Sequence, residues 1–229
     1  MSDRAFHGYI HPGAVYGSAE STAASIMNRV HHATGSSADS NHLPFVPALQ
    51  HRKEIVAIMG HRFESERQAI IDRADRAIQG RFDLLGFKDL DFGTPSNWLL
   101  EPVLSKRSSL RHWSKIRYLD PAVVGDKKIT WELNRHQHFV TLGQAYWMTN
   151  DERYCRAFID QATSWMDANP PKRSINWVSS LELALRSISW LWALHLFAGS
   201  SCLTASFQLR LLKSLIAHGL HLQSYGSQY

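Results

Sequence analysis

The chain has 229 residues, of which 44% are apolar, so it can bury one substantial core in one or two domains. No apolar run approaches the roughly 20 residues that cross a bilayer, so we expect no membrane partner, and residues 1–60 carry no visible secretory signal. The net charge of +5 suits a polyanionic partner, but its Lys and Arg pairs are scattered, which argues against nucleic acid.

Residues 1–43 are rich in Ser, Ala, Gly and His and are predicted to form a poorly ordered arm ahead of a single domain, residues 44–229. We predict no metal site in this arm, because no Cys or carboxylate pattern completes a ligand set with its histidines, His7, His11, His31 and His32. Cys155 and Cys202 lack metal or redox spacing, so they indicate neither a cofactor nor a compartment. Cys155 is predicted to be a buried structural thiol.

From about Arg52 to Gln79 apolar residues recur at helical spacing, which predicts one helix, or two with a break near Gly60. The next fifty residues are punctuated by Gly and Pro and predict an extended, loop-rich segment. Beyond Thr130 the pattern is helical throughout, which predicts an all-α fold of successive helical hairpins.

We expect four helices in this second part. The first opens near Trp131, the second begins at Asn150 and stops at Asn169, and the fourth begins near Thr204. The third starts at Ser179, where Glu182 three residues on predicts a capping box. It is apolar nearly all round, which is typical of a buried helix.

Polar residues are concentrated at the expected starts of these helices. Residues 131–138 read Trp-Glu-Leu-Asn-Arg-His-Gln-His, and residues 174–177 read Ser-Ile-Asn-Trp ahead of the helix that carries Glu182 and Arg186. A purely structural helical protein would not need this concentration, so we interpret it as the lining of a pocket. Glu182 and Arg186 have the spacing of an i,i+4 ion pair.

These strings, with Gly125-Asp126-Lys127 ahead of the first, resemble the helical N-terminal domain of the heparinase II/III and alginate lyase-like polysaccharide lyases. The resemblance runs from about residue 81 to 229. It implies an incomplete α/α toroid, an acidic polysaccharide partner and cleavage by β-elimination, and it suggests a periplasmic setting that the residues themselves do not support. The residues expected to bind substrate are Asn134, Arg135, His136, Asn176, Trp177, Glu182 and Arg186.

A lyase of this kind must neutralise the uronate carboxylate, remove the C5 proton with a Tyr or His base and protonate the leaving oxygen. The resemblance places the Asn/His segment and the catalytic Tyr beyond Tyr229, so the catalytic residues are unknown and we expect the chain alone to be inactive. Tyr225 and Tyr229 are weak candidates for acid or base. His136 and His138 could equally have purely structural roles at a helix start, and packing is the favoured role for Trp131 and Trp177 over sugar stacking.

Three other interpretations remain open. The chain could be a non-catalytic glycan-binding module that uses the same lining, or a merely basic domain. It could also be an α/α-barrel glycoside hydrolase in which Glu132 and Glu182 form the carboxylate pair, although Glu182 already has a role as a cap. The oligomeric state and the particular glycan are not indicated.

Overall fold

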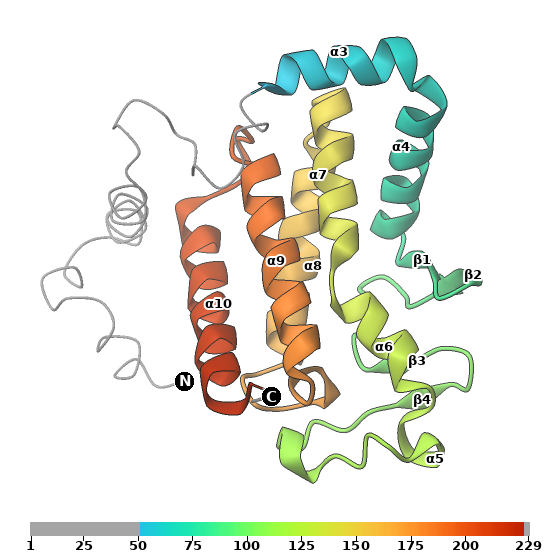
Figure 1. Ribbon diagram of the computed structural model, residues 1–229, viewed down its shortest axis with the longest axis vertical. Helices are drawn as coiled ribbons and strands as arrows, with labels where there is room; N and C mark the ends of the chain where they lie inside the picture. The colour runs from blue at the N-terminus through green and yellow to red at the C-terminus, as the bar shows by residue number, and fades with distance from the viewer. Residues whose placement is uncertain (1–50, 227–229) are drawn as a thin grey trace, which may run out of the picture.

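A computed structural model describes residues 51–226, so the predicted arm and its histidines lie outside the described residues. The described part is built mainly of helices (Figure 1), which confirms the predicted all-α class. The long helices are α3 (Arg52–Arg62), α4 (Glu64–Ile78), α7 (Gln137–Thr149), α8 (Arg153–Ala168), α9 (Ser180–Leu196) and α10 (Ala205–Tyr225).

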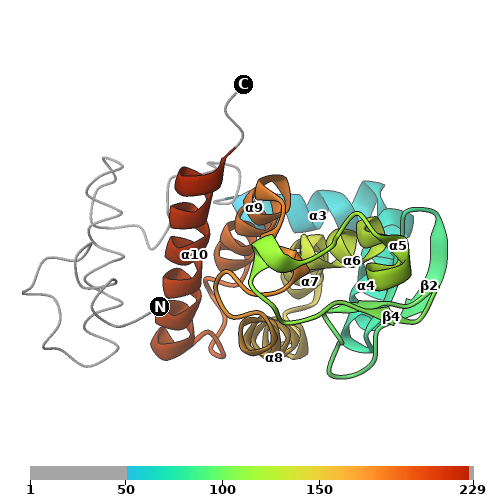
Figure 2. The ribbon, with the colours of Figure 1, turned by 90° about the horizontal axis from the view of Figure 1, so that it is seen from below.

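Helices α4, α7, α9 and α10 stand side by side, α8 lies behind α7 and α9, and α3 lies across one end of the layer (Figure 1 and Figure 2). Helix α7 packs against α4, α8 and α9, and α10 packs against α9 and α8. Short connections turn α7 into α8 and α9 into α10, as expected for antiparallel helical hairpins. No helix in residues 51–226 is long and apolar enough to cross a membrane.

The loop-rich segment between α4 and α7 contains two small antiparallel sheets that the sequence pattern did not predict. Strand β1 (Arg81–Leu84) pairs with β2 (Phe87–Asp91), and β3 (Leu100–Glu101) pairs with β4 (Lys106–Arg107). The rest of this segment holds η3 (Trp113–Lys115), α5 (Pro121–Val124) and α6 (Lys127–Asn134). The segment crosses beneath the ends of the long helices (Figure 2).

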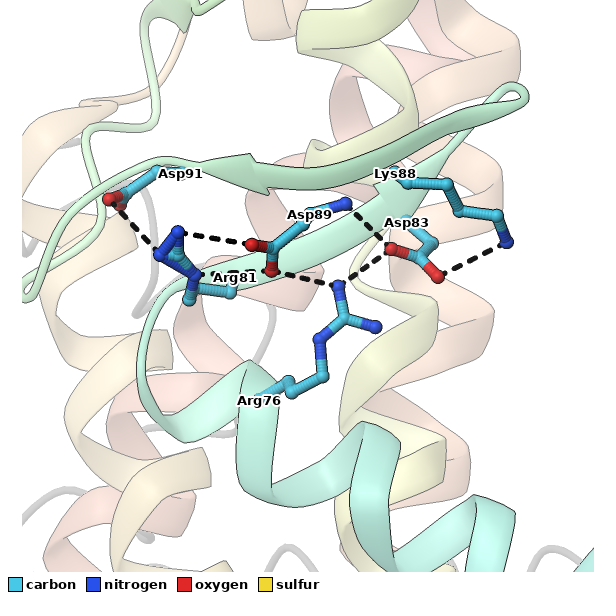
Figure 3. A network of polar contacts seen from close by, with 6 residues as sticks. All are labelled: Arg76, Arg81, Asp83, Lys88, Asp89 and Asp91. Atoms are coloured by element: carbon cyan, nitrogen blue, oxygen red, sulfur yellow. Dashed lines mark hydrogen bonds and ion pairs between the residues drawn. The ribbon is translucent and has the colours of Figure 1, made fainter.

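Ion pairs hold the β1–β2 hairpin against the end of α4 (Figure 3). Arg76 of α4 lies 2.6 Å from Asp83 and 3.1 Å from Asp89 across the hairpin. Arg76 keeps the pKa of Asp83 well below its usual range, chiefly through their hydrogen bond. The network also contains Arg81, Lys88 and Asp91.

The core is strongly aromatic, and most of its buried residues lie on α7, α8, α9 and α10, with others from α4 and the loop-rich segment. Its largest fully buried side chains include Trp98, Trp165, Trp177 and Trp190. Cys155 is fully buried as predicted, and burial raises the pKa of its thiol to about 11, so it is an unreactive core residue.

Three expectations about helix boundaries were wrong. The helix expected to open near Trp131 is two helices, α6 and α7, because His136 adopts the left-handed conformation with φ 56° between them. Asn150 does not start α8 but ends α7 in the same conformation, which Asn tolerates better than most residues. At the start of α9, Ser179 makes no side-chain cap, so the capping box does not form.

The expectation that α9 is buried nearly all round was also wrong. Leu181 and Ile188 are 61% and 48% exposed. The face turned to the core instead carries Glu182, Arg186 and Ser189 among its apolar residues. Helix α9 therefore places polar side chains in the interior of the bundle.

Candidate functional site: a buried polar network at one end of the helical layer

The break between α6 and α7 turns the polar string of residues 131–138 inward. Asn134 closes α6 and is buried, and its amide nitrogen donates to the carbonyl oxygens of Trp98 (3.0 Å) and Thr130 (2.7 Å). Its side-chain oxygen accepts from Trp165 Nε1 at 2.7 Å and from Asn176 Nδ2 at 2.9 Å. One side chain therefore joins four separate segments of the chain.

Asn176 extends this network into the loop ahead of α9. It lies in η4 (Ile175–Trp177) and is fully buried. Its amide nitrogen donates to Asn169 Oδ1 at 2.9 Å as well as to Asn134. Asn169 in turn accepts from Ser174 Oγ at 2.7 Å, and its carbonyl oxygen accepts from Trp177 Nε1 at 3.2 Å.

Arg186 of α9 lies at the centre of the network and is fully buried. Its guanidinium donates to the carbonyl oxygens of Asn134 (3.0 Å) and Asn176 (2.9 Å) and to His218 Nε2 (2.9 Å). It also lies 4.3 Å from the centre of the Trp165 ring, a cation–π contact. The predicted ion pair with Glu182 is not formed, because all three hydrogen bonds of Arg186 go to neutral acceptors.

Burial lowers the pKa of Arg186 to about 9, and the charge of Glu182 opposes this shift, so Arg186 stays protonated at pH 7. His218 donates from Nδ1 to the carbonyl oxygen of Ser214 at 2.7 Å, which leaves Nε2 free to accept from Arg186. Burial, and then the nearby Arg186, holds the pKa of His218 well below its usual value. His218 is therefore a neutral acceptor.

His136 is also enclosed. Its Nδ1 accepts from Trp190 Nε1 at 2.7 Å, so Nε2 carries the proton and has no hydrogen-bond partner among the described residues. Burial and then His138 keep the pKa of His136 well below its usual value. A neutral, enclosed ring cannot supply positive charge to a substrate.

Arg135 lies at the edge of the network, where its side chain is 25% exposed. It makes a bidentate contact with Glu182, with Nε 2.7 Å from Oε2 and Nη2 3.1 Å from Oε1. Its Nη1 lies 2.5 Å from Glu132 Oε2. The hydrogen bond with Glu182 is the main cause of the raised pKa of Arg135.

This arrangement bears on the glycosidase interpretation. Glu132 and Glu182 both accept from one guanidinium, whereas a glycosidase needs one carboxylic acid free to donate its proton. The geometry therefore disfavours the pair as an acid and base. A cavity of about 260 Å³ opens beside Glu132, between α4, β1 and the start of α7, and His138 lies in its wall.

The structure thus brings all seven predicted residues together at one end of the helical layer. Six are at most 3% exposed, and Arg135 is the most accessible. They do not line an open pocket, which corrects the interpretation of these residues as a pocket lining, and their role in binding substrate remains a prediction. Sequence reasoning missed other members of the network, and nothing in their spacing singles them out: Trp98, Trp165, Asn169 and His218.

Comparison with known proteins shows what this chain is similar to. A family model described as heparinase II/III N-terminus matches residues 24–229. A heparin-sulfate lyase of Pedobacter heparinus is 26% identical over 149 residues, which make up 62% of this chain and 19% of that protein. A heparin-sulfate lyase of Bacteroides stercoris is 36% identical over 47 residues, or 20% of this chain and 7% of that protein.

Solved structures share the fold. The crystal structure of heparan sulfate lyase HepC from Pedobacter heparinus matches 92% of this chain and 29% of its own, with a TM-score of 0.58 and 18% identity. A heparinase III structure with methylated lysines matches 70% of this chain and 25% of its own, with a TM-score of 0.57 and 20% identity. The chain spans less than a third of the length of each of these relatives.

Proposed function

Since the chain belongs to the heparinase II/III N-terminal family, we propose that it is the substrate-cradling part of a polysaccharide lyase. The lyase would cleave a uronic-acid-containing acidic polysaccharide by β-elimination. The substrate class is supported by the names of the relatives, which are heparin-sulfate lyases. The net charge of +5 suits the same kind of partner.

The observation that carries the proposal is the buried network around Arg186. It ties together the end of α6, the loop ahead of α9 and the last turns of α10, and it presents Arg135 at the surface. Preorganised scaffolds of this kind hold binding groups in place. We assign Asn134, Asn176 and Arg186 to positioning, together with His136 and Trp177.

Arg135 is the member of the predicted set that we assign to sugar contact, and the buried Glu182 would position it. Arg135 is flanked by two carboxylates, so the local charge of the triad is net negative. The triad therefore offers donors and acceptors suited to sugar hydroxyl groups rather than to a uronate carboxylate.

We further propose that the chain alone binds acidic oligosaccharide weakly and does not cleave it. The enclosed His136 and His218 are unsuited to reach a sugar C5 proton. Loss of even one preorganised donor at a centre that develops charge costs on the order of 10²–10³ in rate. We therefore expect no cleavage by a chain that spans less than a third of the length of its lyase relatives.

The test is to incubate the purified chain with heparan sulfate, alginate and other uronans and to follow the ultraviolet absorbance of the unsaturated product. Calorimetry on the same mixtures measures binding. We expect binding without product. Sustained turnover that Tyr225→Phe or Tyr229→Phe abolishes would show that the site is complete in this chain, and the absence of binding to every uronan would refute the cradling role.

A further inference from the structure

Two loops of the chain lie side by side beneath the ends of α9 and α10. Trp113 N donates to the carbonyl oxygen of Lys172 at 2.9 Å, and Ser174 N donates to that of Arg111 at 3.0 Å. His112 and Arg173 form an antiparallel bridge between them. The backbone therefore fixes residues 111–113 against residues 172–174, although they are far apart in the sequence.

The paired loops are basic and contain no carboxylate. Residues 109–119 and 170–181 include no Asp or Glu. The exposed cations Arg111, Lys115, Lys172 and Arg173 form no ion pair with any carboxylate in residues 51–226. Arg76 of α4 and Arg81 of β1, by contrast, are already paired with aspartates. The loops are thus a concentrated source of unneutralised positive charge.

An aromatic cluster borders these cations. The Trp113 ring lies 5.1 Å from the Tyr225 ring and 5.5 Å from the His221 ring, centre to centre. Lys172 Nζ lies 5.5 Å from the centre of the Tyr225 ring, which is in a residue that is 44% exposed. Aromatic rings beside free cations can pack against the apolar face of a sugar while the cations meet its acidic groups.

The cluster also holds two unsatisfied polar atoms. Trp113 Nε1 and His221 Nδ1 are buried and have no hydrogen-bond partner among the described residues. His221 is 1% exposed, and it links the cluster to the buried network through Trp177, whose ring lies 5.5 Å away. Buried groups of this kind are normally paired. Both atoms are enclosed, so a ligand would meet the exposed cations and Tyr225 rather than these two atoms.

We propose that the basic loop pair, defined as Arg111–Lys115 with Lys172 and Arg173, together with Tyr225 binds the carboxylate and sulfate groups of an acidic glycan. The choice of a glycan, rather than another polyanion, as the ligand rests on the proposed function. The basic loop pair would supply the positive charge that the net-negative Arg135 triad cannot supply. Arg135 would then contact the sugar hydroxyl groups, and the loops would contact the carboxylate and sulfate groups.

The test compares two double variants of the whole chain that change the net charge equally. Arg111→Gln/Lys172→Gln removes two loop cations, and Lys53→Gln/Arg62→Gln removes two exposed cations from α3 at the other end of the layer (Figure 1). Binding to a heparan sulfate oligosaccharide is measured by calorimetry. We expect the loop variant to weaken binding roughly tenfold and the α3 variant to change it by less than about twofold.

A third variant, Tyr225→Ala, tests the aromatic contribution, and we expect it to weaken binding in high salt as well as in low salt. Equal affinity of the two double variants would overturn the inference while leaving the proposed function intact. Binding of a single-stranded polyuridylate as tight as that of the glycan would overturn it too, because the loops would then be a general polyanion surface. A chain that bound no uronan would refute both proposals.

Discussion

At the scale of single residues, the unusual feature is a fully buried arginine whose hydrogen-bond partners are all neutral. Burying a cation is costly unless its donors are satisfied. Arg186 meets this condition with two carbonyl oxygens, one imidazole nitrogen and the face of Trp165. Only a planar group with several fixed donors can reach all of them, so the site selects Arg over Lys.

We therefore predict that Arg186→Lys lowers the free energy of unfolding by about 2–4 kcal/mol, since one ammonium group cannot replace the three hydrogen bonds. Urea denaturation measures the change. Arg210→Lys is the matched control, because Arg210 is 44% exposed and pairs with Asp167, and it should cost less than about 0.5 kcal/mol. Equal losses in the two variants would contradict the structural role of Arg186.

At the scale of elements, α7 and α9 approach closely at a glycine. A Cβ atom added at Gly143 would lie 2.6 Å from Leu196 Cβ, which is closer than real side chains come. The two helices also share a hydrogen bond from Trp147 Nε1 to the carbonyl oxygen of Leu196. This contact fixes how α9 lies on α7, and hence where Arg186 enters the core.

Gly143→Ala should destabilise the protein by about 1–3 kcal/mol, because the added methyl group overpacks this contact. Gly219→Ala, on an open face of α10, should instead be neutral or stabilising by up to about 1 kcal/mol, since alanine favours the helix. Thermal unfolding of the two variants distinguishes a packing effect from helix propensity. A stabilising Gly143→Ala would show that α7 and α9 can separate without cost.

At the scale of the whole molecule, four histidines make the fold sensitive to acid. Burial is the main cause of a lowered pKa for His136, His138, His218 and His221, and it brings His138 to about 3 and His221 to about 4. In the unfolded chain these rings take up protons below about 6.5, whereas in the folded chain they do not. Stability is therefore lost as the pH falls below the unfolded value.

We predict that the free energy of unfolding falls between pH 7 and pH 5, with each such histidine adding a slope of up to about 1.4 kcal/mol per pH unit. Denaturant unfolding at several pH values measures this slope. His138→Gln should make it shallower, whereas His61→Gln, at an exposed position of α3, should leave it unchanged. A flat profile over this range would mean that these rings are hydrated in the folded state.

Much of the fold follows from local patterns. The Asn169-Pro170 stop and the Thr204 cap lie where the structure ends α8 and starts α10. Helical periodicity predicted either one helix or two with a break near Gly60, and the structure has two, α3 and α4, with the break at Phe63. The two small sheets were missed, because each is too short to show a period in the sequence.

The candidate site was predictable in part of its membership but not in its form. The types and spacing of Asn134, Asn176 and Arg186 marked them as a group, and the structure brings them together. Spacing could not show that they face inward. It also favoured a pair between Glu182 and Arg186, whereas Glu182 contacts Arg135 from another helix.

The sequence by itself determined the helical class, several helix ends and the overall positive charge, because caps, prolines and periodicity act within a few residues of the chain. Only the tertiary structure decided that His136 breaks a helix with φ 56°, that Arg186 is buried, and that Arg111 lies beside Ser174. These features depend on contacts between segments tens of residues apart. Such contacts form only when the whole core packs, so no local pattern specifies them.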